Sequence, residues 1–319
     1  MHKSESRIVL FGILISLCFM SGIAKVASAA GIASILFPEL AALSYDVFVR
    51  PRGVWARAPL MLAITPALTA LLGIVVTRHM PYGPWSISVC IVGSIAIIKG
   101  LRSPVAPAIS ACFLALALGE TSWWYPASIL AGTCVLAGLS MLHRKVLSAD
   151  MPSKRDTAAD VIDDELERLP GQFSWVPFFA VFLLLAYLLS TWSGLRMVFF
   201  PPLVVIAFEM FSHSDVCPWA QRPAMMPCVC TITAAAGVAA VALFDVGALS
   251  TALAMLVGVA TLRLSRVHVI PALAVSLLPQ VMPRADWYFP VAVAVGSTLL
   301  TACFLVFRRI PSAVPRVTG

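Results

Sequence analysis

The sequence predicts an all-α fold, a polytopic transmembrane helical bundle built from two parallel internal repeats. Three observations lead to this prediction. The chain is 60% hydrophobic and only 12% charged, which is about half the charge of a soluble domain. Apolar segments suited to the roughly 30 Å hydrocarbon layer of a bilayer recur along the chain. Finally, one half of the sequence repeats the other half at an offset of 164 residues.

The repeat needs no gap between residues 55 and 145. Residues of unrelated chemistry recur in register, which apolar bias alone does not produce. The pairs include Trp55 and Trp219, Gly73 and Gly237, Arg102 and Arg266, Pro107 and Pro271, Trp123 and Trp287, and Arg144 and Arg308. Self-similarity at a fixed period indicates a duplicated structural unit. In a membrane chain, duplication favours a substrate path between the two halves.

Each half contains six apolar segments. They lie at 8–28, 30–48, 58–77, 85–99, 104–118 and 124–142, and at 173–190, 196–211, 223–243, 247–262, 267–281 and 288–307. Segments 85–99 and 104–118 are shorter than the about 20 residues of a full span, so they either span or re-enter, and we expect about 10 to 12 spans. Ala27-Ser28-Ala29 resembles a signal-peptidase site, but Lys25 interrupts its approach. We therefore expect 8–28 to be a retained span, with a cleaved signal as the alternative.

The domain boundaries follow from these segments. Residues 1–145 form the first transmembrane repeat, 146–172 a charged cytoplasmic linker, 173–310 the second repeat and 311–319 a C-terminal tail. Seven of the fifteen acidic residues lie between His143 and Gln172. Charge without apolar periodicity favours a flexible connector there, and a short helix over 157–169 is the alternative.

Basic residues predict the topology. They gather at the N-terminus, in the linker and at the C-terminus, so all three regions are expected in the cytoplasm, with the bacterial plasma (inner) membrane as the location. Each repeat then has an even number of spans, which makes the repeats parallel. The net charge of +7 reflects this distribution, and no basic and aromatic surface for nucleic acid is present. Trp85, Trp123, Trp124 and Tyr125 suit an interfacial aromatic belt.

No catalytic motif is visible in the sequence. It lacks a GxSxG elbow, a Walker A loop and an HExxH pair, so we expect no enzyme activity and no cofactor. The eight cysteines include no CxxC pair, and Cys228-Val229-Cys230 is not a usual metal spacing, so no metal site is expected. Small residues such as Gly132, Gly138, Gly237, Gly247 and Gly296 are expected to allow close helix packing.

Two matched turns carry the first candidate site. Lys99 and Arg102 precede Ser103-Pro104, and Arg263 and Arg266 precede His268. Ser103 is a good N-cap and Pro104 a good first helical residue. The free N–H groups of a helix beginning there would favour an anion, assisted by the nearby cations. The alternative is plain topology, because cytoplasmic loops carry Lys and Arg and proline starts helices.

Acidic residues within apolar segments are the second candidates. Glu39 follows Phe37-Pro38, and Asp46 and Glu209 occupy similar places near segment ends. A carboxylate inside a membrane is costly and faces a water path or the protein interior, where a raised pKa suits a proton relay or gate. Alternatively, Asp46 and Glu209 lie at the interface and pair with the arginines of the 50–57 loop.

The chain resembles the HPP family of small membrane proteins. Pro218–Pro223 is similar to the Ser-Pro-Leu-Ala-Gln-Pro-like loop of that family, and Val54–Pro59 is a weaker echo. Ser103–Ala108 stands where the His-Pro-Pro-Ala-Gly-Ala-like turn is expected, with Ser103 in place of the His, and Trp123–Pro126 precedes a final span as in the family. Because some members are linked to nitrite transport, the resemblance implies a tandem duplication of a nitrite-transport unit.

These observations favour a secondary transporter or permease for a small solute, for which an inorganic anion such as nitrite is the first candidate. The two repeats would form a pseudo-dimer within one chain, with the lipid bilayer and the solute as its partners. The alternative is a non-transporting scaffold or sensor that acts through its cytoplasmic linker. A wet, basic cavity between the halves would favour transport, and a dry seam would favour the scaffold.

Overall fold

In the computed structural model, residues 3–147 and 173–310 are described. Every regular element within these two ranges is helical, which confirms the predicted all-α class. Eight of the described helices are long and apolar enough to cross a membrane. They are α1 (Lys3–Ala30), α4 (Pro59–His79), α5 (Pro84–Leu101), α7 (Trp124–Leu147), α9 (Val176–Ser193), α11 (Met225–Phe244), α12 (Ala248–Ser265) and α14 (Tyr288–Arg308). The predicted linker and C-terminal tail lie almost wholly outside the described residues.

The remaining apolar segments fold into shorter helices, which explains why the long helices are fewer than the expected spans. These are α2 (Glu39–Val49), α6 (Ala108–Leu118), α10 (Pro201–Ser212) and α13 (Ala272–Leu277), which η3 (Leu278–Gln280) extends. An 11-residue helix is about 16 Å long, roughly half of the hydrocarbon layer. Segment 85–99, by contrast, is part of the 18-residue α5, so it is long enough to span.

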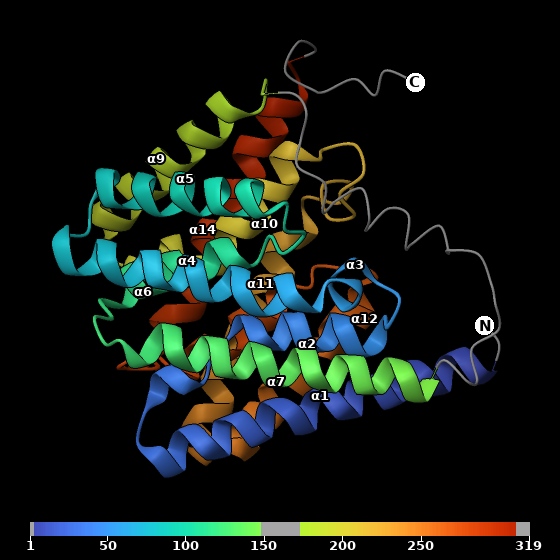
Figure 1. Cartoon of the computed structure of the whole chain (residues 1–319). Coiled ribbons are helices and arrows are strands. Elements are labelled where there is room, and N and C mark those ends of the chain that lie inside the picture. Colours follow the sequence, from blue (N-terminus) through green and yellow to red (C-terminus); the bar gives the residue numbers. More distant parts are fainter. Residues whose placement is uncertain (1–2, 148–172, 311–319) are drawn as a thin grey trace.

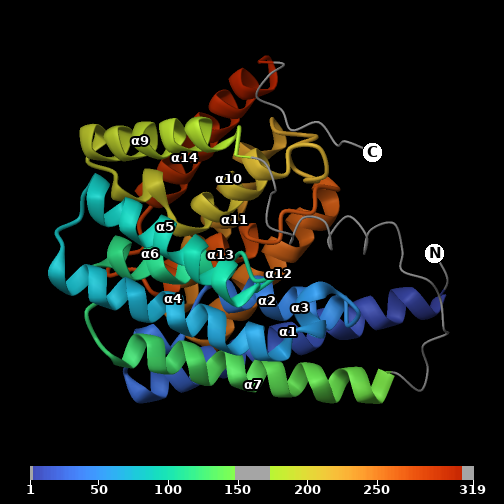
Figure 2. The same cartoon turned by 45° about the horizontal axis from the view of Figure 1, so that its top comes forward.

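The short helices form the centre of the molecule. Almost all residues of α2, α6, α10 and α13 are buried. Contacts run from α6 to α10, from α2 to α13 and from α10 to α13, so this layer joins the two halves. In Figure 1 the first half, coloured blue to green, lies mostly below and in front of the second half. In both views α9 lies above α5 (Figure 1 and Figure 2).

Elements follow one another in the same order in both halves. The short links η1 (Ala33–Ile35) and η2 (Arg196–Phe199) precede α2 and α10, whereas α3 (Val54–Arg57), which precedes α4, has no helical counterpart before α11. Helices α5 and α12 begin and end at positions 164 residues apart, and both end on an arginine in the left-handed conformation, Arg102 and Arg266. Arg144 and Arg308 both donate to a carbonyl at matching positions, Ala56 and Ala220. A duplicated unit predicts this agreement in detail.

Glycines bring the long helices onto the short ones. A Cβ on Gly73 of α4 would lie 2.5 Å from the carbonyl oxygen of Cys112 in α6. A Cβ on Gly237 of α11 would lie even closer to the carbonyl of Ser276 in α13. The packing expectation therefore holds for Gly237, whereas a Cβ on Gly138 would meet no described atom within 4 Å.

The predicted aromatic belt is correct at three of its four positions. Trp85, Trp123 and Trp124 are exposed, as interfacial side chains should be. Tyr125 is only 3% exposed and donates its hydroxyl to the carbonyl of Ala111, 2.6 Å away. It belongs to the core because the first turn of α7 packs its polar tip against a carbonyl of α6.

Candidate functional site at the junction of the two halves

A basic junction forms where α2 of the first half meets the turn before α13 of the second. The ring of Tyr45 on α2 lies 6.5 Å from the ring of His268, measured between centroids. Burial, together with the smaller effects of the charges of Arg50 and Arg263, lowers the pKa of His268 to about 3. The imidazole is therefore neutral at physiological pH. We call Arg50, Arg263 and His268 the basic junction.

Asp46 balances part of this charge. The Nε of Arg50 donates to the Oδ1 of Asp46 at 2.7 Å, and the two groups form an ion pair one helical turn apart. The sequence left two roles open for Asp46, a proton relay or gate and an ion pair with an arginine of the 50–57 loop. The structure shows the ion pair. Arg263, an exposed residue in the last turn of α12, adds positive charge that acts on His268 from the second half.

The predicted helix start at Ser103-Pro104 is wrong, whereas anion binding at the two matched turns stays a prediction. Helix α6 begins at Ala108 and not at Pro104, because a residue before proline avoids the helical conformation and Ala106 precedes Pro107. The first amides of α6 and α13 are already used. Those of Ala108, Ile109 and Ser110 donate to carbonyls of the preceding turn, as do those of Ala272, Leu273 and Ala274.

Ser103 has a different role from the one predicted. Its Oγ accepts hydrogen bonds from Thr65 Oγ1 at 2.7 Å and from the amide of Val105 at 3.2 Å. The indole of Trp55 donates to the carbonyl of Pro104 at 2.8 Å. Together these bonds hold the turn before α6 against α3 and α4, so Ser103 stabilises the loop and does not cap the helix.

The remaining predicted cations do not join the basic junction. Arg102 and Arg266 are exposed residues at the left-handed ends of α5 and α12. Lys99 is also exposed, with its Nζ 5.5 Å from the ring centroid of Phe173. The two matched turns therefore contribute unequally: the second supplies Arg263 and His268, while the first supplies no side chain to the junction.

Two buried carboxylates lie in the central layer. Glu39 and Glu209 are each 2% exposed, at the start of α2 and within α10. Glu39 accepts a hydrogen bond from Ser110 Oγ of α6. Among the described atoms, the Oε2 of each glutamate has no hydrogen-bond partner. An unpaired charge in such a place is costly, so burial favours the neutral form of both carboxyl groups.

The centre of the seam between the halves is dry. Phe113 of α6 and Phe199 of η2 are fully buried, and their ring centroids lie 4.7 Å apart. Arg196 donates to the carbonyl of Leu116 at 3.0 Å and thereby ties η2 to the end of α6. The seam thus combines a closed apolar centre with a basic junction at one end.

Arg50 and Tyr45 were missed as site residues in the sequence. Arg50 stands out only as one of several cations in the 50–57 loop, and its nearness to His268 depends on how α2 packs against α13. In the described ranges 3–147 and 173–310, no group of three or more His, Cys, Asp or Glu side chains could hold a metal.

Comparison with known proteins adds no relative. No protein-family profile, no curated protein sequence and no solved structure matches this chain. The fold and the eight long apolar helices define the class by themselves. The chain is an integral membrane protein of the polytopic α-helical class.

Proposed function

We propose that this protein is a secondary transporter or permease for a small inorganic anion, with nitrite as the first candidate. One observation carries the proposal: α2 packs against α13 with the Tyr45 and His268 rings 6.5 Å apart, and charges from both halves, Arg50 and Arg263, act on the neutral His268. A small anion binding there would gain charge-assisted hydrogen bonds. It would also raise the pKa of His268, because an anion offsets the two cations that oppose protonation.

The central layer supports a path through the protein. Transporters commonly bind their solute where discontinuous or short helices meet between two repeats. Here α2, α6, α10 and α13 are short, buried and shared between the halves. The dry centre corresponds to a closed conformation, so transport requires the short helices to separate around Phe113 and Phe199. Glu39 and Glu209, buried beside this path, suit proton coupling or gating.

The duplication supports the same arrangement. We propose that the two halves are parallel repeats that form a pseudo-dimer about an axis along the membrane normal. The basic residues near both ends support cytoplasmic termini, with a bacterial inner membrane as the proposed location. The resemblance to the HPP family supports nitrite as the solute to be tested first.

Uptake into proteoliposomes tests this function. Purified protein is reconstituted, and the initial rate of nitrite uptake is compared with that of empty vesicles. Arg263→Gln should lower the rate about tenfold, the value of a lost hydrogen bond to a charged group. The double variant Asp46→Asn/Arg50→Gln should have a similar effect. It removes the Arg50 charge without leaving the buried Asp46 carboxylate unpaired. Arg102→Gln and Arg266→Gln are matched controls that remove exposed cations outside the junction.

Two outcomes contradict the proposal. If vesicles with the unmodified protein take up nitrite no faster than empty vesicles, the protein is not a nitrite transporter. Uptake that survives Arg263→Gln but fails in Arg266→Gln moves the anion site away from the basic junction.

The dry seam favours one alternative, a scaffold or sensor that acts through residues 146–172. Most of that segment lies outside the described residues, so the test is a deletion. Removing residues 150–168 should leave anion uptake intact if the protein is a transporter. If the deletion abolishes the cellular function while the purified protein keeps its thermal stability and transports nothing, the scaffold is correct.

A further inference from the structure

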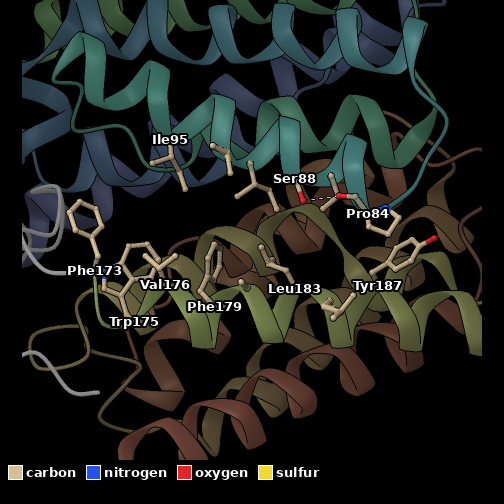
Figure 3. A pocket seen from close by; sticks show the side chains of 14 residues that line it. Pro84, Ser88, Ile95, Phe173, Trp175, Val176, Phe179, Leu183 and Tyr187 are labelled. Atoms are coloured by element: carbon tan, nitrogen blue, oxygen red, sulfur yellow. Dashed lines mark hydrogen bonds between the residues drawn. The ribbon is translucent and has the colours of Figure 1, made fainter. Parts of the chain in front are cut away.

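An apolar groove runs between α5 and α9 on the side of the bundle. Its volume is about 410 Å³, and its walls include Ile91 and Ile95 of α5 and Phe179 and Leu183 of α9. Figure 3 shows Ile95 on one side of the opening and Phe179 and Leu183 on the other. The hydroxyl of Ser88, a polar group on this wall, already donates to the carbonyl of Pro84 at 2.8 Å. The groove therefore suits a ligand without polar atoms along its length.

The corresponding place in the other half is closed. By their order in the repeat, α1 corresponds to α9 and α12 to α5. Helix α1 packs directly against α12, whereas α5 and α9, both fully described, leave the groove between them. The groove is thus specific to one side of the molecule and does not follow from the duplicated fold alone.

The groove opens sideways, toward the lipid. Val92 and Leu184 both line it, and they are 66% and 50% exposed. Both lie on helices that are apolar and long enough to span a membrane. A ligand would therefore enter from the bilayer and not from water.

The length of the groove matches one leaflet of a bilayer, and a positive charge lies at one end of the groove. From Val176 to Tyr187, α9 extends along the groove for about 16 Å, roughly the depth of one leaflet of a 30 Å hydrocarbon layer. At the end formed by Phe173, the exposed Lys99 lies over that ring, 5.5 Å away. Arg102, also exposed, follows within one helical turn. A cation at the end of an apolar groove is complementary to an anionic amphiphile.

We propose that this groove binds one acyl chain of an anionic phospholipid, with the lipid phosphate at Lys99. The acyl chain fills the space between α5 and α9, whereas α1 and α12 pack directly against each other at the corresponding place. The lipid then joins the two halves at the edge where α5 and α9 fail to pack. This inference depends on the membrane class of the protein and not on the proposed transport function.

Photo-crosslinking tests the site. The full chain is placed in nanodiscs containing phosphatidylglycerol with a diazirine on its acyl chain, and cross-linked peptides are mapped by mass spectrometry. Labelling should concentrate on α5 and α9. Ala180→Trp, which fills the groove from α9, should remove that labelling. The matched control Ala131→Trp, at an exposed position of α7, should leave it unchanged.

The charged end has its own test. Lys99→Gln should reduce the preference of the groove for phosphatidylglycerol over phosphatidylcholine about fivefold, the contribution of one basic residue near an anionic lipid. Because Lys99 is exposed, this variant is expected to fold even if Ala180→Trp does not. An unchanged preference overturns the placement of the phosphate.

Other results overturn the lipid site as a whole. Equal labelling of all lipid-facing helices indicates ordinary annular lipid. Labelling of α5 and α9 that persists in Ala180→Trp has the same meaning. Labelling that occurs only after residues 150–168 are deleted shows that this part of the chain, and not a lipid, occupies the groove.

Discussion

Tyr45 and His268 face each other across the boundary between the two halves, with ring centroids 6.5 Å apart. One residue comes from a short helix of the first half, and the other from the turn that precedes a short helix of the second. Their contact marks the place where a cation of each half approaches the same imidazole. This shared position is the reason for locating an anion site at the junction and not at either turn alone.

The pH dependence of stability should report on His268. Its pKa is about 3 in the folded protein and near 6.5 when unfolded, so the unfolded chain binds the proton more readily. Stability is therefore retained above pH 6.5 and lost as pH falls, by about 2 kcal/mol at pH 5. His268→Asn should remove this loss, so its apparent Tm in detergent should exceed that of the unmodified protein at pH 5 but not at pH 7.5.

Added anion provides the control for His268. Nitrite at the junction should raise the pKa of His268 and so weaken the destabilisation at low pH. If the two proteins lose stability equally on acidification, with or without nitrite, the imidazole does not lie in the electrostatic environment described.

Glu39 should be more stable as its neutral isostere when the solution is basic. Its side chain is 2% exposed and its Oε2 has no hydrogen-bond partner among the described atoms. Burying an unpaired negative charge there is costly. Glu39→Gln imitates the neutral acid and should raise the apparent Tm at pH 8 while leaving it unchanged at pH 4.5.

Glu39→Asp provides a comparison that keeps the acid but shortens its reach toward Ser110. It should lower the apparent Tm at both pH values. A Glu39→Gln variant that is less stable than the unmodified protein at pH 8 would show that the carboxylate is charged and stabilised in the interior.

The two left-handed arginines should tolerate glycine. Arg102 and Arg266 have φ values of 50° and 53°, a conformation that costs a residue with a side chain about 1 kcal/mol or more relative to glycine. Arg102→Gly and Arg266→Gly should therefore keep or raise the apparent Tm. Lys99→Gly, inside the last turn of α5, should lower it by about 1 kcal/mol in stability. Equal losses in all three variants would contradict the left-handed helix ends.

A glycine that lies against a neighbouring helix should not tolerate a larger residue. Gly73→Val would drive two methyl groups into the carbonyl of Cys112, so we expect little folded protein by size-exclusion chromatography. Gly138→Ala lies in a helix where the added Cβ meets no described atom within 4 Å and should stabilise by about 0.5 to 1 kcal/mol. Normal folding of Gly73→Val would show that α4 and α6 are farther apart.

Much of the fold could be predicted because its signals are local. Hydropathy alone indicates the apolar segments, and the register of Trp55 with Trp219 predicts that the elements recur. The start of α6 was predicted wrongly because Ser103-Pro104 has the local chemistry of a helix start, while Pro107 delays the helix to Ala108. The position of Tyr125 beside the exposed Trp123 and Trp124 predicts an interfacial residue, but its side chain is buried.

The sequence by itself determined the all-α membrane class of the protein and the approximate positions of its long helices, since composition and backbone preference act within a few residues. Only the tertiary structure decided which charges meet. Arg50 approaches His268 because α2 packs on α13 across the two halves, whereas Arg102 and Arg266 remain apart on exposed helix ends. Charge interactions depend on distance in space, and a repeat in sequence does not specify how its two copies pack together.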